Sequence, residues 1–171
     1  VWNSRTADFW LKKNCGLTCP LELNGREWRQ LFDQICREKG EDVPEKLIYG
    51  RIPVMLTANC IAKTAGKCLR GQTGRTEATR AEAALTDRYQ KQFPVELCCD
   101  VCMNVIYNSV PLSLHREWEH CDHVYKRLSF TTESGEEMGR ILRFFADSAG
   151  VGQQKPPFED YTTGHEKRGV L

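Results

Sequence analysis

Two short groups of cysteines carry the residue types and spacings that could do chemistry. Cys60 and Cys68 are separated by seven residues, and Cys99 and Cys102 form a C-x-x-C pair. Thiolates bind zinc and iron–sulfur clusters, and a C-x-x-C pair can place two sulfurs on one ion or one cluster edge. The upstream pair would complete four ligands. The sequence therefore predicts a four-thiolate site, for which zinc and an iron–sulfur cluster are both suitable.

A simpler interpretation is that these four cysteines are structural thiols in the core, because cysteine is among the most buried residues. The paired spacing favours ligation. Cys98 could replace Cys99, but three residues would then separate it from Cys102, which is a less usual spacing. The other cysteines, which we expect to pack in the core, are Cys15, Cys19, Cys36 and Cys121.

Length and composition indicate one domain over residues 1–171, with a formal net charge of +1. We expect no membrane partner, because no apolar run reaches the roughly 18 residues that a span requires. The chain begins without a secretory signal pattern, and its nine cysteines are an odd number. These features argue against a disulfide framework and predict a reducing, cytoplasmic location.

The first half of the chain alternates short apolar runs with amphipathic segments, which is typical of βαβ units and a parallel sheet. Ser4 is the expected cap of a helix that runs to about residue 14. Asn24 is the expected cap of a second helix, which Gly40 ends. We expect parallel strands near residues 1–3, 17–23, 46–50 and 128–131, with at least one sheet edge open or apolar.

The middle and the end of the chain have other patterns. Residues 63–80 form a basic, glycine-punctuated loop that could contact RNA phosphates, although a run of this size is usually solvated surface. Alternating apolar residues predict a hairpin over 85–97, in preference to a helix over 78–85. A strand is expected over 105–107, a helix in the second half of 112–125, and a capping-box helix from Ser134 to about residue 148. On the 112–125 helix, His120, Cys121 and His123 more simply form a solvated face than a metal site.

Common hydrolase and nucleotide-binding signatures are absent from the sequence. It contains no G-x-S-x-G, no H-E-x-x-H and no phosphate-binding P-loop. A peptidase needs a nucleophile or an activated water with a base in reach, and the sequence shows no such pair.

Several short motifs occur together in order along nearly the whole chain. They are P-L-E-L-N at 20–24, Y-G-R-I-P-V-M at 49–55 followed by Cys60, L-T-D-R at 85–88, I-Y-N-S at 106–109, F-T-T-E at 130–133 and T-T-G-H-E-K-R-G-V at 162–170. In this combination the chain resembles the collagenase-like protease family, the thirty-second peptidase family of unassigned mechanism. Thr163 departs from the pattern, since the family usually has arginine there, and the substrate could differ accordingly.

The resemblance implies an α/β fold, a (β/α) barrel-like catalytic domain of which this chain supplies the later strands and the C-terminal edge. We expect an inserted β-hairpin or loop region to carry the cysteines. The first strands would come from a missing N-terminal segment or a partner chain. Several family members are implied to be oxygen-independent hydroxylases that carry a [4Fe–4S] cluster and modify RNA bases or a quinone precursor, some with prephenate as hydroxyl donor. Cys60, Cys68, Cys99 and Cys102 resemble the cluster ligands of the RNA-modifying branch.

The same motifs suggest side chains for the substrate. Guanidinium groups bind carboxylate or phosphate in a two-pronged manner, which suits RNA or a dicarboxylate donor. Alternatively, Arg51 and Arg88 form structural ion pairs with Glu22 or Asp87. We thus expect an RNA hydroxylase, with a metal-stabilised peptidase and a zinc-stabilised binding module as alternatives. The substrate-binding candidates are Arg51, Arg88, Arg127, His165 and Arg168.

Overall fold

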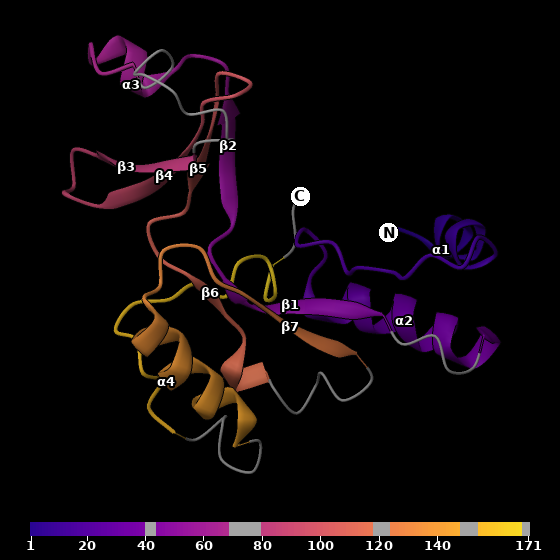
Figure 1. Cartoon of the computed structure of the whole chain (residues 1–171). Coiled ribbons are helices and arrows are strands. Elements are labelled where there is room, and N and C mark those ends of the chain that lie inside the picture. Colours follow the sequence, from indigo (N-terminus) through magenta and orange to yellow (C-terminus); the bar gives the residue numbers. More distant parts are fainter. Residues whose placement is uncertain (40–43, 69–79, 118–123, 148–153, 169–171) are drawn as a thin grey trace. The chain divides into compact units, whose positions relative to one another are not determined.

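The computed structural model describes residues 1–39, 44–68, 80–117, 124–147 and 154–168 (Figure 1). The chain divides into two compact units. The flanking unit comprises Val1–Gly50 and Leu112–Leu171, and the inserted unit comprises Arg51–Pro111. One domain over residues 1–171 stays a prediction. Within the described residues, no helix is both long and apolar enough to cross a lipid bilayer.

The flanking unit holds a three-stranded sheet with its most buried strand in the centre. The strand order is β6 (Leu112–Ser113), β1 (Glu45–Gly50) and β7 (Tyr125–Ser129), with β7 parallel and β6 antiparallel to β1. Residues 46–50 of β1 are all buried, as is typical of a strand covered on both faces. The described helices of this unit are α1 (Ser4–Leu11), α2 (Gly25–Lys39) and α4 (Gly135–Ala146).

Tyr49 of β1 lies at the centre of the aromatic core of this unit. Its ring centroid is 6.0 Å from that of Phe145 on α4, 5.8 Å from Phe130 and 5.3 Å from Phe158. Its hydroxyl donates to Glu133 at 2.9 Å, which satisfies the polar end of the ring. The core side of α2 contributes Trp28, Phe32 and Ile35, each 2% exposed.

Two of the four strands expected to be parallel are not strands. The β1–β7 pair confirms the prediction for 46–50 and 128–131, although β7 begins and ends earlier than expected. Residues 1–3 precede α1, whose cap is Asn3 rather than Ser4: its side chain accepts from the Thr6 N–H. Residues 17–23 form only an isolated bridge, between Thr18 and Glu45. Pro20 has no N–H for a ladder, which disfavours a longer strand there.

The inserted unit is an antiparallel sheet in the order β2 (Pro53–Thr57), β5 (Met103–Tyr107), β4 (Gln92–Cys98) and β3 (Arg80–Thr86), with the short helix α3 (Ile61–Thr64). The β3–β4 pair confirms the hairpin, and the helix alternative for 78–85 is wrong from residue 80 onward. The alternating apolar residues of the hairpin face a small core. This core contains Val95, Leu97 and Ile106.

The mixed α/β class is confirmed, and the cysteine pairs lie in an inserted region that contains hairpins, as expected. The described strands form two sheets and no closed barrel, and the inserted sheet is wholly antiparallel. The segment between β1 and β6 pairs with itself in antiparallel hairpins, which need only short turns, instead of forming a helical crossover. The barrel-like arrangement stays a prediction. Val54, Met55 and Leu56 are exposed on β2, an edge strand of the antiparallel sheet, so this apolar edge is not in the sheet for which one was expected.

Some predictions fall on residues outside the described ranges. They are the helix end at Gly40, residues 69–79 of the basic loop, and the helix across 118–123 with His120, Cys121 and His123.

The helix cap predicted at Asn24 and the capping box predicted at Ser134 are both present, and Asn24 also forms a capping box, with Glu27. The Asn24 side chain accepts from the N–H groups of Arg26 and Glu27, while the Glu27 carboxylate accepts from the Asn24 N–H. Ser134 and Glu137 make the same reciprocal pair, and α4 ends at Ala146. Each box satisfies backbone donors that a helix start leaves without partners.

We predict that Ser134→Ala lowers the free energy of unfolding by about 1 kcal/mol, because the Glu137 N–H loses its acceptor. Urea denaturation followed by circular dichroism measures this. Ser134→Thr keeps a hydroxyl acceptor and is the matched control. Equal stability of Ser134→Ala and wild type would show that the cap contributes nothing to α4.

Candidate metal or cluster site

The C-x-x-C pair occupies the tight turn between β4 and β5. Cys98 and Met103 are the last paired residues of the two strands, so residues 99–102 form the turn itself. Cys102 has φ +54°, a left-handed conformation that non-glycine residues adopt mainly in turns. The turn therefore places Cys99 and Cys102 together at the tip of the hairpin.

Cys60 reaches the same end of the inserted sheet through the pairing of β2 with β5. Thr57 at the end of β2 lies opposite Asn104, which is two residues after Cys102. Cys60 then caps α3, where its Sγ accepts from the Lys63 N–H at 3.5 Å. Hydrogen bonds to sulfur are one means by which a protein tunes a thiolate site.

All four predicted ligands line one small cavity of about 10 Å³. Burial raises the pKa of Cys99, and the neighbouring Cys60, Cys68 and Cys102 raise it further because like charges repel. A bound cation would reverse that repulsion. The cavity is lined by Cys60, Ala62, Cys68, Leu97, Cys98, Cys99, Cys102, Met103 and Asn104.

The thiols are neighbours but are not arranged as a finished coordination sphere. In the described ranges, no three Cys, His, Asp or Glu side chains are grouped so that they could hold a metal ion. Binding would have to draw the sulfurs together, to metal–sulfur distances of about 2.3 Å. The donor chemistry fits a soft metal or an iron–sulfur cluster, since the four predicted ligands line one cavity and the eight described cysteines form no disulfide.

The three other described cysteines belong to the flanking unit and line no part of this cavity. Cys15 and Cys36 are partly exposed, whereas Cys19 is buried with the Lys46 ammonium 3.9 Å from its Sγ. Burial is the main cause that raises the pKa of Cys19 to about 11. A thiol with so high a pKa is neutral at physiological pH and is a poor nucleophile or ligand.

Asn104 holds together two of the segments that line the cysteine cavity. The sequence analysis did not identify this residue. The residue is 0% exposed, and its Nδ2 donates to the carbonyl oxygens of Thr57 at 3.3 Å and Asn59 at 2.9 Å. It thereby ties the segment that carries Cys60 to the strand that follows Cys102. Its buried Oδ1 has no hydrogen-bond partner among the described residues. A polar residue at an inward position of a strand was the only sequence signal.

We predict that Asn104→Ala lowers the free energy of unfolding by about 2 kcal/mol, because two buried carbonyl groups lose their donor. The metal retained per chain should also fall by more than half, since Cys60 is no longer tied to β5. Thermal unfolding and elemental analysis measure the two effects. Asn108→Ala, just beyond the opposite end of β5, is the matched control, and equal metal retention in the two variants would contradict this function of Asn104.

The two candidate arginines of the inserted unit have different surroundings. Arg51 is half-buried, and its Nη1 donates to the carbonyl oxygens of Asn108 at 3.1 Å and Ser109 at 2.6 Å. It therefore fastens the two ends of this unit together. Arg88 is exposed and lies over the ring of Tyr89 at 4.7 Å, so its guanidinium can still accept an anion.

The remaining candidates lie in the flanking unit. Arg127 forms an ion pair with Glu45 at 2.7 Å, which links β7 to β1 and supports a structural function. His165 and Arg168 are exposed in the turn over residues 164–168, where the Arg168 N–H donates to the His165 carbonyl. These two side chains remain open to a substrate.

The buried side chain of Glu166 anchors the turn between His165 and Arg168. The sequence analysis did not identify this residue. The carboxylate accepts from Trp28 Nε1 at 3.0 Å and lies 3.1 Å from Lys46 Nζ and 3.7 Å from Arg29 Nη1. The Glu166 carbonyl accepts from the Gly25 N–H at 2.7 Å. A side chain at Gly25 would approach the Glu166 carboxylate to 2.5 Å, so this close contact requires glycine.

We predict that Glu166→Gln lowers the free energy of unfolding by about 3 kcal/mol, because the Lys46 ammonium, with 6% of its side chain exposed, loses its counter-charge. Glu45→Gln removes a carboxylate from the much more exposed pair with Arg127 and should cost less than about 1 kcal/mol. Urea denaturation of both variants makes the comparison. Equal losses of unfolding free energy would show that burial does not increase the contribution of the Lys46–Glu166 pair to stability.

A serine–histidine pair bears on the peptidase alternative. Ser113 Oγ lies 2.9 Å from His115 Nδ1, and both residues are 1% exposed. Burial is the main cause that lowers the pKa of His115. Aromatic rings enclose the histidine, with that of Tyr161 at 4.7 Å. A nucleophile must reach its substrate, so this pair is a core contact.

Comparisons with known proteins add no family assignment. No family model matches the chain, and neither curated proteins nor solved structures give a significant match.

Proposed function

We propose that the chain binds a [4Fe–4S] cluster through Cys60, Cys68, Cys99 and Cys102 and serves an oxygen-independent hydroxylation of an RNA base. The observation that carries the proposal is the convergence of these four thiols on one cavity from two segments of the inserted unit. Four thiolates are the usual ligand set of such a cluster. RNA and the reaction class rest on the motif resemblance.

When bound, a cluster of this kind supplies redox or Lewis-acid chemistry at iron. The chain itself supplies the thiolates and the side chains that would hold the reactants. Arg88, His165 and Arg168 are exposed, and they are the candidates for contacts with RNA phosphates or with a dicarboxylate hydroxyl donor such as prephenate. Arg51 and Arg127 instead hold carbonyl groups and a carboxylate of the chain.

Zinc is the second candidate, and the size of the cavity favours it. A volume of about 10 Å³ is close to that of a single water-sized sphere, so one ion requires less movement of the thiols than a cluster does. With zinc the site would be structural, because four cysteines leave no open coordination position. The inserted unit would then be a zinc-stabilised binding module.

We predict that protein purified without oxygen contains about four irons per chain and absorbs visible light as an iron–sulfur protein does. Single Cys→Ser changes at positions 60, 68, 99 and 102 should each remove most of the iron. Iron, sulfide and zinc assays with an absorbance spectrum measure this. About one zinc per chain and no iron would establish the zinc alternative.

Two cysteines serve as matched controls for this experiment. Cys98→Ser changes a thiol that lines the same cavity but has the less usual spacing, and Cys15→Ser changes a thiol of the flanking unit. Both variants should keep their iron. Loss of iron in Cys98→Ser but not in Cys99→Ser would show that Cys98, and not Cys99, is the ligand.

A further inference from the structure

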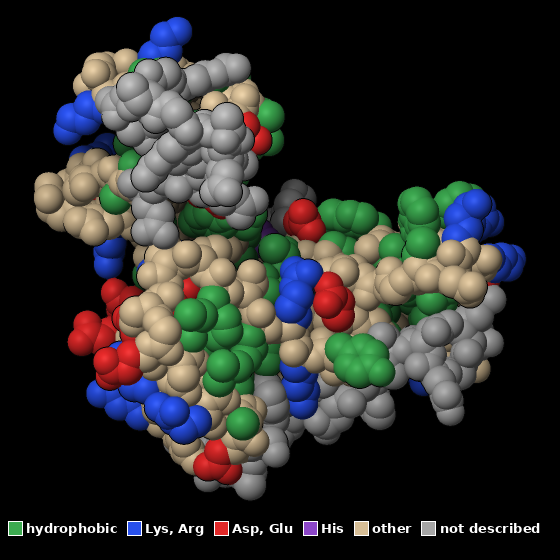
Figure 2. Space-filling view, in the orientation of Figure 1, with side chains coloured by type: hydrophobic (Ala, Val, Ile, Leu, Met, Phe, Trp, Pro, Cys, Tyr) green, Lys and Arg blue, Asp and Glu red, His purple; other side chains and the backbone are tan. Residues whose placement is uncertain are grey.

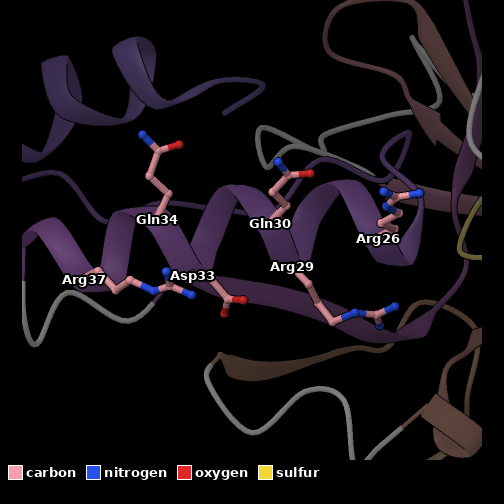
Figure 3. A pocket seen from close by; sticks show the side chains of 6 residues that line it. All are labelled: Arg26, Arg29, Gln30, Asp33, Gln34 and Arg37. Carbon is pink, nitrogen blue, oxygen red and sulfur yellow. The ribbon is translucent and has the colours of Figure 1, made fainter.

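One side of α2 carries a row of polar side chains rich in arginine. They line an open depression of about 740 Å³ and are Arg26, Arg29, Gln30, Asp33, Gln34 and Arg37. We call this set the arginine face. Figure 3 shows Gln30 and Gln34 projecting to one side of the helix, and Arg29 and Asp33 to the other. With 3.6 residues per turn, the set covers somewhat less than half of the helix circumference, opposite the buried Trp28 and Phe32.

The arginine face has an excess of positive charge, and Arg29 is its one arginine with an acidic partner among the described residues, the Glu166 carboxylate at 3.7 Å. It holds three guanidinium groups and one carboxylate. The Arg26 and Arg37 side chains form no hydrogen bond or ion pair with any described residue. Arg29 is oriented by the Trp28 ring, 5.4 Å from its guanidinium carbon, and remains more than one-third exposed. Figure 2 shows one face of the molecule with side chains coloured by type; acidic and basic side chains lie close together in its lower left part.

The spacing of the arginines suits an extended polyanion. Arg26 and Arg37 are eleven residues apart, or about 16 Å at 1.5 Å per residue. A single small anion cannot contact both. Each strand of a DNA duplex carries a phosphate for about every 3.4 Å of helix axis, so a nucleic-acid strand can offer several phosphates over this distance. Guanidinium groups bind phosphate in a two-pronged manner. Gln30 and Gln34 add amide groups suited to phosphate oxygens and ribose hydroxyls.

We propose that the arginine face binds the phosphodiester backbone of single-stranded RNA. The inference rests on the RNA substrate of the proposed function and assigns the surface that holds it. The first turn of α2 is tied to the 164–168 turn, since the Gly25 N–H donates to the Glu166 carbonyl and Arg29 lies beside the Glu166 carboxylate. A strand that follows α2 toward Gly25 therefore arrives at the exposed His165 and Arg168.

The test is the affinity of the full chain for a fluorescent single-stranded RNA of mixed sequence, measured by anisotropy over a range of salt concentrations. Arg26→Gln combined with Arg37→Gln should raise Kd about tenfold and lower the slope of log Kd against log salt by about 1.4, since each phosphate contact on a single strand contributes about 0.7. Asp33→Asn should lower Kd about twofold, because it removes the one acidic side chain of the face.

The matched control is Arg140→Gln combined with Arg143→Gln, which removes the same charge from exposed positions of α4. This control should leave Kd and its salt dependence within about twofold of wild type. An equal effect of the two double variants, or no effect of the α2 changes, would overturn the inference. Competition by polyglutamate as strong as that by RNA would overturn RNA as the partner. Unchanged thermal unfolding shows that the variants are folded.

Iron content separates this inference from the proposed function. Chain that lacks a cluster but binds RNA through α2 would support the arginine face and contradict the cluster. Chain that holds a cluster but shows no affinity for RNA would overturn the arginine face and the RNA substrate together, while the four-cysteine assignment stands.

Discussion

The pairing of β2 with β5 is the constraint on which the candidate site depends. It places Thr57 opposite Asn104 and so brings Cys60 to the end of the sheet where the β4–β5 turn carries Cys99 and Cys102. A strand register slipped by one residue would turn every side chain to the opposite face. The buried Asn104 amide opposes such a slip, because its two hydrogen bonds reach the Thr57 and Asn59 carbonyls only in this register.

The sequence predicted those features that depend on residues close together in the chain. Apolar alternation predicted the β3–β4 hairpin, capping residues predicted the starts of α2 and α4, and cysteine spacing grouped the residues that line the cavity. The parallel strand expected at 17–23 is absent except for one bridge. An apolar run that contains Pro20 does not indicate which strand it would pair with. Likewise, Glu166 and Lys46 are far apart in sequence, and only tertiary packing makes them a buried ion pair.

Buried polar groups position the candidate functional residues in both units. In the flanking unit, Glu166 anchors the turn that exposes His165 and Arg168; in the inserted unit, Asn104 anchors the cysteine segment. Burying such groups is costly unless their partners are in place, so each anchor favours a single arrangement of its segment. The exposed side chains can then be presented to a substrate without further ordering.

The central claim is that the four cysteines of the inserted unit share one metal centre. X-ray absorption at the iron and zinc edges of anaerobically purified protein tests it most directly, because the method identifies both the metal and its ligand atoms. The account predicts iron surrounded by sulfur at about 2.3 Å, with this signal lost in Cys99→Ser. Metal bound only by oxygen or nitrogen, or a sulfur signal that persists in Cys99→Ser and Cys102→Ser, would contradict it.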